Sequence, residues 1–96
     1  MSDHELRNDT DHHRYELVRD DRVIGIADYR LAGDVVVIPH TEIDRPLRGQ
    51  GLGAVLVQAV LDDVRAAGRT VVPQCWFVAQ FIDEHPDYAD LVRSAP

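Results

Sequence analysis

Short apolar runs dominate the first half of the chain, and each run ends at a turn signal. The runs are rich in Val, Ile and Tyr, and they span residues 14–19, 22–30 and 34–43. Asp20-Asp21 separates the first two runs, and Ala32-Gly33-Asp34 lies between the second and the third. Connections this short suit antiparallel hairpins, so the pattern predicts a three-stranded meander. Because proline cannot donate to a ladder, Pro39 predicts a bulge, an edge or a strand break just before His40.

After Gly51 the apolar spacing changes from two residues to about 3.6, which indicates an amphipathic helix that ends at Gly68. Its predicted buried stripe consists of Leu52, Val55, Leu56, Ala59, Val60 and Val64. A short buried strand over 69–73 and a second helix over 74–84 follow, and His85-Pro86 stops that helix. Residues 87–94 add a last helical turn or two with Asp87 as the N-cap. This order predicts an α/β (α+β) fold in which helices cover one sheet.

The N-terminal residues 1–12 lack this periodicity and contain one large apolar residue, Leu6. We therefore expect a flexible arm over 1–12 and a single domain over 13–96. His4, His12 and His13 could in principle bind a metal ion. An exposed arm gives such ligands no fixed geometry, so the sequence predicts no metal site.

Composition narrows the class of protein. With 96 residues and 45% hydrophobic residues, the chain has room for one compact unit. Its formal net charge of −7 argues against a nucleic acid or an anionic membrane as partner. No apolar run approaches the roughly 20 residues of a membrane span, and the polar start lacks a signal segment. We expect a cytoplasmic protein, either a monomer or a weak homodimer.

The basic residues are ten Arg and no Lys, which excludes a Walker A loop and every Schiff-base mechanism. The single cysteine, Cys75, excludes an internal disulfide and every metal motif that needs several cysteines.

The most informative segment is a glycine loop at residues 48–53, Arg-Gly-Gln-Gly-Leu-Gly, which precedes the long helix. Glycines allow backbone N–H groups to approach an anion, and the helix N-terminus adds partial positive charge, so a pyrophosphate is a suitable ligand. Gly49, Gly51 and Ala54 also satisfy a G-x-G-x-x-A dinucleotide fingerprint. A polar stretch with a proline separates these glycines from the strand, and no acidic residue lies about 20 positions further on, which disfavours a dinucleotide site.

The spacing Arg48-x-x-Gly51-x-Gly53 resembles the R/Q-x-x-G-x-G/A pyrophosphate signature of the GNAT N-acetyltransferase superfamily. The stretch 37–91 is further similar to very small GNAT-like proteins that keep little beyond the acetyl-CoA core. The motifs that carry this likeness are Ile-Pro-His-Thr-Glu-Ile at 38–43, the glycine loop, Val-Pro-Gln-Cys at 72–75 and Phe-Ile-Asp-Glu-His-Pro-Asp-Tyr at 81–88.

The resemblance implies an acetyl-CoA site whose pyrophosphate lies on the glycine loop and whose pantetheine arm follows residues 38–43. The implied cofactor-binding residues are Ile43, Arg45, Leu47, Arg48, Gly49, Gln50, Gly51, Leu52 and Gly53. The thioester would point toward His40 and Cys75, and the N–H group of Ile43 or Glu42 would polarise its carbonyl. The second helix carries no tyrosine to serve as the leaving-group acid, and Tyr88 lies beyond the proline that ends it.

Three residues are the candidates for catalysis. His40 suits a general base because its ordinary pKa lies near 6.5, and Glu42, on the same strand face, could orient it or attract a cationic amine. Cys75 lies at a helix N-terminus, which lowers a thiol pKa, so it could protonate coenzyme A or carry the acetyl group itself. The structural alternatives are a histidine satisfied within the sheet and a small buried thiol. Trp76, Phe77 and Phe81 are expected in the core, with one of them free to line the groove.

The resemblance thus implies an acetyl-CoA-dependent N-acetyltransferase that acts on an amine acceptor, and we expect that amine to be carried on a protein or peptide or on a small molecule. Only Asp20-Asp21 joins the first two predicted strands, so no helical wall encloses the acceptor there. The alternatives are a non-catalytic acyl-CoA-binding sensor or interaction module, and a structural domain with a glycine-rich turn.

Overall fold

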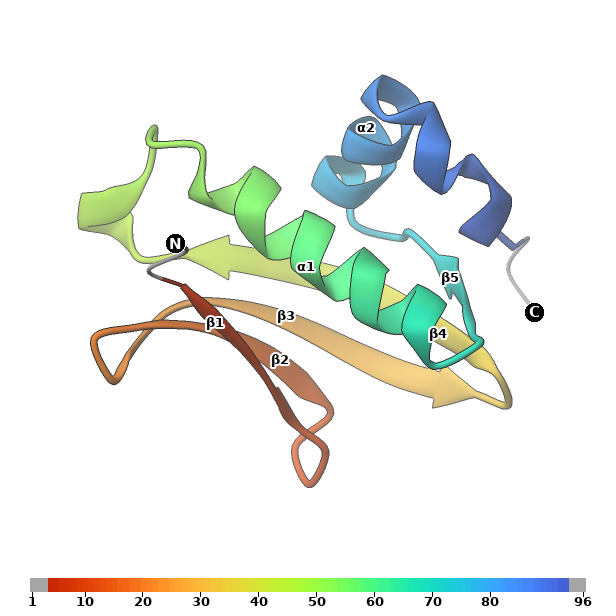
Figure 1. Ribbon diagram of the computed structural model, residues 1–96, viewed down its shortest axis with the longest axis horizontal. Coiled ribbons are helices and arrows are strands. Elements are labelled where there is room, and N and C mark those ends of the chain that lie inside the picture. The colour runs from red at the N-terminus through yellow and green to blue at the C-terminus, as the bar shows by residue number, and fades with distance from the viewer. Residues whose placement is uncertain (1–3, 94–96) are drawn as a thin grey trace.

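A computed structural model describes residues 4–93 of the chain (Figure 1). The elements in chain order are β1 (Glu5–Asp9), β2 (Arg14–Arg19), β3 (Arg22–Ala32), β4 (Val35–Ile43), the 3-10 turn η1 (Arg45–Leu47), α1 (Leu52–Ala66), β5 (Thr70–Val72), α2 (Trp76–Glu84) and the 3-10 segment η2 (Pro86–Leu91). The mixed fold class, the three-stranded meander and both helices are confirmed. Within the described residues, no helix is both long enough and apolar enough to cross a bilayer.

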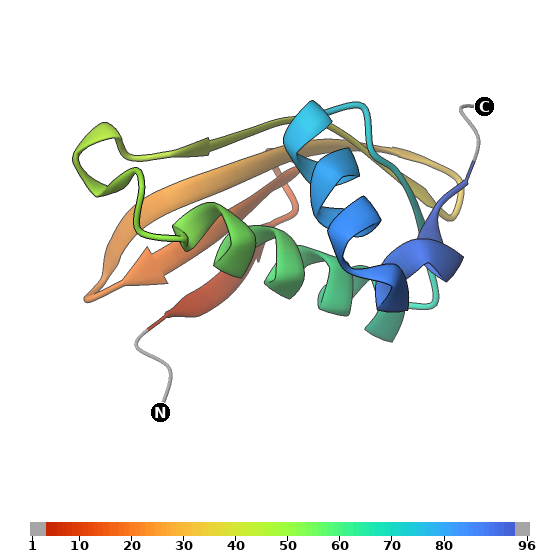
Figure 2. The same ribbon diagram turned by 90° about the horizontal axis from the view of Figure 1, so that it is seen from above.

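One sheet holds all five strands in the order β1-β2-β3-β4-β5. The first four strands are antiparallel neighbours, and β5 pairs parallel to β4. Figure 2 shows both helices on one side of the curved sheet, with α2 beside α1 near the β5 edge. α1 is the crossover between β4 and β5, which is the usual way to join two parallel strands.

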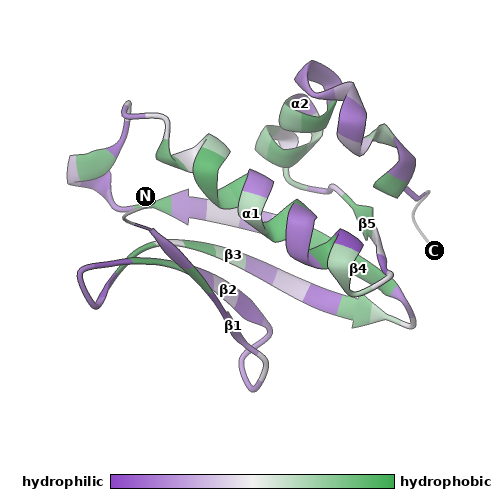
Figure 3. Ribbon diagram, in the orientation of Figure 1, coloured by the Kyte–Doolittle hydropathy of each residue, from purple (hydrophilic) through white to green (hydrophobic). Residues whose placement is uncertain are grey.

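The prediction of a flexible arm over residues 1–12 is wrong where the structure describes that segment. Glu5–Asp9 forms β1, which pairs along its whole length with β2, from Glu5 opposite Val18 to Asp9 opposite Arg14. This strand is largely hydrophilic and lies at the edge of the sheet (Figure 3). Backbone hydrogen bonds to β2 hold it, so the apolar pattern carried no sign of it. Residues 1–3 lie outside the described part of the chain.

The buried stripe of α1 differs from the predicted one at two positions. Val57 and Leu61 are buried, whereas Val55 is exposed and Ala59 is only half-buried. The full set of buried residues is Leu52, Leu56, Val57, Val60, Leu61 and Val64. Apolar residues lie on both sides of the central stripe, and the 3.6-residue period alone does not show which side is buried. Packing against the sheet buries the side that carries Val57 and Leu61.

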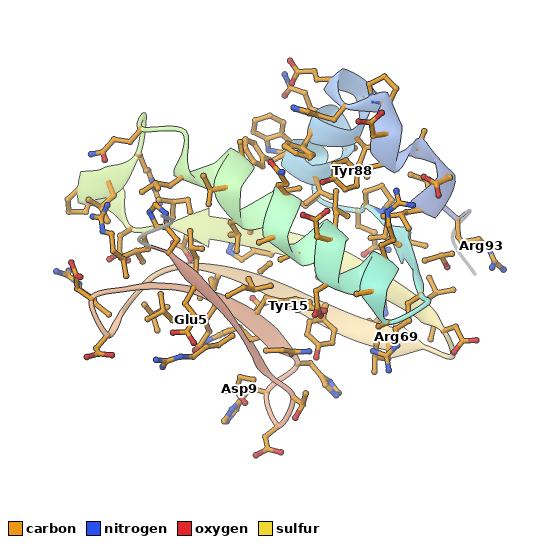
Figure 4. All side chains as sticks on the ribbon, viewed as in Figure 1. Glu5, Asp9, Tyr15, Arg69, Tyr88 and Arg93 are labelled. Atoms are coloured by element: carbon orange, nitrogen blue, oxygen red, sulfur yellow. The ribbon has the colours of Figure 1, made fainter. Side chains whose placement is uncertain are left out.

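The C-terminal segment is held against α1 by polar contacts. Arg65 donates to both carboxylate oxygens of Asp90 at 2.9 Å. The hydroxyl of Tyr88, a residue labelled in Figure 4, donates to Asp62 at 2.7 Å. The Tyr15 hydroxyl ties β2 to the same helix by donating to Asp63 at 2.7 Å. The expected N-cap at Asp87 is wrong, because η2 begins at Pro86 and no side chain caps it.

Pro39 lies in a β-bulge, which is one of the three outcomes that its position in the sequence allowed. Arg30 pairs with Val37 and Asp28 pairs with His40, so β4 fits three steps against two of β3. Arg30 and Asp28 lie on the same face of β3, because side chains alternate along a strand. Val37 and His40 therefore share a face too, and the bulge changes which residues of β4 face the helices.

Candidate active site

The candidate site exists because β4 is much longer than its parallel neighbour. β4 has nine residues and β5 has three, and they pair only through Val35–Val37 and Thr70–Val72. The Cys75 N–H group makes the next contact, to the Ile38 carbonyl at 2.9 Å. Beyond that point no strand among residues 4–93 covers the outer edge of β4, and a cavity of about 550 Å³ lies there. Its lining includes the three predicted catalytic residues His40, Glu42 and Cys75.

The bulge divides the second half of β4 between the two faces of the sheet. His40 and Glu42 lie on the face away from α1, where both are exposed. Ile43 lies on the helix face, since its side chain comes near Leu56 in the space over Gly25, and Thr41 shares that face by alternation. The cavity thus spans the strand edge, with a thiol on one side and an imidazole and a carboxylate on the other.

Cys75 is the N-cap of α2, and its thiol lies among hydrogen-bond donors. Its Sγ atom is 3.5 Å from the Thr41 hydroxyl oxygen. Burial alone raises the pKa of the Cys75 thiol. The hydrogen bond with Thr41 and the backbone N–H groups of Val78 and Phe77 act the other way and prevail, so this pKa lies below its ordinary value.

A chain of polar contacts runs along the other side of the strand. His40 Nε2 is 3.5 Å from Glu42 Oε2, and the other carboxylate oxygen, Oε1, is 3.7 Å from Arg48 Nη2. Arg48 Nε also donates to the Ile43 carbonyl at 3.0 Å. The expectation that His40 and Glu42 share a face and lie close together is confirmed.

The register of the sheet identifies which N–H groups of β4 are free to meet a ligand. The Asp44 N–H group donates to the Ile24 carbonyl, so Ile43 is in a pair whose own polar groups point away from β3. Its carbonyl accordingly meets Arg48. Glu42 alternates with Ile43 and directs its N–H group into the ladder. Ile43, rather than Glu42, therefore has the N–H group available at the cavity.

The glycine loop forms a second cavity, of about 460 Å³, that adjoins the first. Gly49 and Gly51 have positive φ angles of 84° and 78°, a conformation that other residues adopt at a cost. Gly51 is the N-cap of α1, no side chain caps the helix, and its first turn holds no acidic residue. The N–H groups of that turn thus face the cavity without a side-chain acceptor, so the loop fits an anion such as a pyrophosphate.

Of the nine predicted cofactor residues, seven line this second cavity and two do not. The seven are Ile43, Leu47, Arg48, Gly49, Gly51, Leu52 and Gly53. Ile43, Arg48 and Gly53 also line the first cavity. Arg45 borders only a separate polar cavity of about 300 Å³, and Gln50 is an exposed residue that lines none of the three.

Two aromatic residues of α2 line the site, and the sequence did not distinguish their positions. Phe77 lies between the two cavities and packs so closely on α1 that a Cβ atom at Gly53 would come within 2.8 Å of its ring. Trp76 was expected in the core, but it is 74% exposed and borders the first cavity. Of the three aromatic residues of α2, Trp76, Phe77 and Phe81, only Phe81 is buried. Trp76, the first residue of α2, thus lies at the cavity rim, whereas the partly buried Phe77 packs against the edge of the core.

Two further residues have structural partners. His85 lies in the turn after α2, where Nδ1 is 2.8 Å from the Phe81 carbonyl and the ring stacks on that of Phe81. Tyr88 donates to Asp62, which raises the pKa of its hydroxyl, and it does not line either large cavity. Across residues 4–93 no group of three His, Cys, Asp or Glu side chains is arranged to hold a metal ion.

The sequence as a whole matches a known family. A family profile described as GCN5-related N-acetyl-transferase matches residues 14–91. Protein NATD1 from Bos taurus is 30% identical over 76 residues, which cover 79% of this chain and 66% of that protein. Protein NATD1 from Mus musculus is 29% identical, with 79% and 68% covered. The chain thus spans about two thirds of the length of these relatives.

Solved structures show the same fold at lower identity. The solution structure of a GCN5-like protein from Staphylococcus aureus aligns with a TM-score of 0.70 and 21% identity, over 100% of this chain and 94% of that one. The ribosomal-protein-S18-alanine N-acetyltransferase from Escherichia coli aligns with a TM-score of 0.55 and 19% identity, over 60% of this chain and 38% of that enzyme. At these identities the likeness concerns the fold.

Proposed function

Because this chain belongs to the GCN5-related N-acetyltransferase family, we propose that it is an acetyl-CoA-dependent enzyme that transfers an acetyl group to an amine. The observation that carries the proposal is the open edge of β4. There one cavity gathers His40, Glu42 and Cys75, and it adjoins a glycine-lined cavity suited to a pyrophosphate. An anchor for the cofactor and groups able to move protons therefore lie side by side.

The cofactor would be held mainly by backbone. The loop from Leu47 to Gly53 presents N–H groups and the N-terminus of α1, and Arg48 supplies the nearest positive charge. The open edge of β4 after the bulge would lie along the pantetheine arm. When bound, acetyl-CoA supplies an acetyl group activated as a thioester.

The carboxylate of Glu42 and the imidazole of His40 would receive the proton that the attacking amine loses. They lie 3.5 Å apart, so the carboxylate can also orient the ring. The Ile43 N–H group would stabilise negative charge on the carbonyl oxygen during attack, in the manner of an oxyanion hole.

Cys75 has two possible roles. Its thiol could give a proton to the departing thiolate, with the amine attacking directly. Alternatively its thiolate could attack the thioester, take the acetyl group and release the thiolate of coenzyme A. The amine would then attack the Cys75 thioester and release the Cys75 thiolate, and the lowered pKa of Cys75 favours this second route.

The acceptor would approach from the open side. Asp20 and Asp21 form a tight two-residue turn between β2 and β3, with φ angles of 51° and 64°, and no helix is inserted there. An open approach suits an amine carried on a protein or peptide better than a small metabolite that needs enclosure.

Calorimetry with acetyl-CoA, followed by an assay for free thiol over a panel of amines and peptides, tests the proposal. We expect binding and amine-dependent thiol release. Binding without release at any pH would favour an acyl-CoA-binding module, and absence of binding would refute a role for the cofactor.

Intact-mass analysis of wild type and Cys75→Ala, with and without hydroxylamine, distinguishes direct attack from transfer through Cys75. Only transfer through Cys75 gives a hydroxylamine-labile acetyl group that requires this residue.

A further inference from the structure

Arg48 occupies a position that no other charged residue of the site shares. It borders both large cavities and the smaller polar one. Its guanidinium lies 3.7 Å from the Glu42 carboxylate, while its Nε donates to the Ile43 carbonyl. The residue that the glycine motif assigns to the cofactor is therefore already paired with a carboxylate on the acceptor side of β4.

We propose that Glu42 and the anion bound by the glycine loop compete for the guanidinium of Arg48. In the free protein Arg48 neutralises Glu42. In the loaded protein Arg48 turns to the pyrophosphate, and the Glu42 carboxylate becomes available to the ammonium group of the acceptor. The inference rests on the proposed function and adds a coupling between its two binding sites, with a cationic amine as the acceptor.

Reorientation of the Arg48 side chain should cost little free energy. Its side chain is 52% exposed, and that of Glu42 is 53% exposed, so neither charge needs to leave a buried environment. Exposed ion pairs of this kind contribute little to stability. Arg48 and the following Gly49 both line the second cavity, and apart from its chain neighbours no atom lies within 4 Å of the position of a Cβ atom at Gly49.

The other charged groups nearby do not offer the same exchange. Asp44 pairs with Arg22 at 3.7 Å and has no ion pair with Arg48. Arg45 borders the smaller polar cavity but not the glycine-lined one. Among the described arginines, only Arg48 borders both large cavities and is paired with Glu42.

Competition of this kind makes an unusual prediction, namely that removing a charged residue tightens cofactor binding. Calorimetric titration with coenzyme A measures it directly and needs no acceptor. Glu42→Gln should lower the dissociation constant about two- to five-fold, the range that corresponds to a surface ion pair. Arg48→Gln should raise the constant, and adding Glu42→Gln to Arg48→Gln should then change nothing.

Asp44→Asn is the matched control, because it removes one negative charge two residues away without touching Arg48. An equal gain in Asp44→Asn and Glu42→Gln, or a gain from Glu42→Gln that persists in the Arg48→Gln background, would mean a general charge effect and would overturn the proposal. So would an unchanged affinity in Glu42→Gln. If wild type fails to bind coenzyme A at all, the proposed function fails first.

Discussion

The two halves of β4 meet at the bulge and have opposite properties. Before the bulge, Val36 and Val37 are 1% and 0% exposed and pair with strands on both sides. After it, His40 and Glu42 are exposed and only β3 pairs with the strand. The first half satisfies its backbone within the fold, and the second leaves polar groups for a ligand. One strand thus holds the sheet together at one end and carries the candidate chemistry at the other.

If the open half carries the chemistry, Glu42→Gln should show the largest effect. We expect turnover to fall about 100- to 10,000-fold, the range for loss of a group that moves protons. The free energy of unfolding should change by less than about 0.5 kcal/mol, since the side chain is half exposed. Thiol release and urea denaturation measure the two quantities. Full turnover in this variant would remove Glu42 from the mechanism.

Ile38→Ala tests the buried part of β4, at the start of the bulge, in the opposite sense. Ile38 is 1% exposed and packs in the core, so its truncation should cost about 2–5 kcal/mol of stability. His40→Ala, two residues on, should cost about 0.5 kcal/mol or less. Urea denaturation of both variants checks the contrast. Similar losses in the two variants would contradict the division of the strand.

Gly51→Ala should show whether the glycine loop binds coenzyme A, which an ordinary turn does not. An alanine at a φ angle of 78° costs roughly 1–2 kcal/mol, and it should also weaken binding of coenzyme A. Gly33→Ala is the matched control, because Gly33 has a φ angle of 62° in the turn between β3 and β4, away from both large cavities. We expect a similar loss of stability there with unchanged affinity, and equal losses of affinity would refute the role of the loop.

The smallest expected effect concerns the Cys75 thiol. Since hydrogen bonds favour the thiolate, its pKa is lowered, and the rate of alkylation by iodoacetamide should rise with pH around a midpoint below 9.0. Thr41→Val removes one of these hydrogen bonds and should move the midpoint upward by less than about one unit. A midpoint that stays in place would show that the N–H groups of α2 act alone.

The sequence predicted the elements that bury side chains, and it missed the strand that is held mainly by backbone hydrogen bonds. Alternation located β2, β3 and β4, and the 3.6-residue period located α1, because these elements bury side chains. β1 escaped detection since an edge strand of polar residues is held by hydrogen bonds to its neighbour. Trp76 was misplaced for a related reason, since its apolar character predicts burial while its position at the open sheet edge prevents it.

The sequence identified most residues of the candidate site but not their arrangement in space. Alternation placed His40 and Glu42 on one face, and Pro39 predicted a bulge, an edge or a strand break. Only the pairing with β3 shows that it is a bulge and that the pair lies on the face away from α1. Thr41 was missed because nothing in its sequence neighbourhood suggests a contact with Cys75, 34 residues away. The roles of these residues stay predictions until the experiments above are done.

Trp76 gives the molecule its own optical reporter. It is the one tryptophan of the chain, and 74% of its surface is in contact with water at the rim of the cavity. A water-exposed indole emits at long wavelength, and any ligand that covers it shifts the emission to the blue. Occupancy of the cavity can therefore be followed by intrinsic fluorescence, at micromolar protein and in real time, without a label.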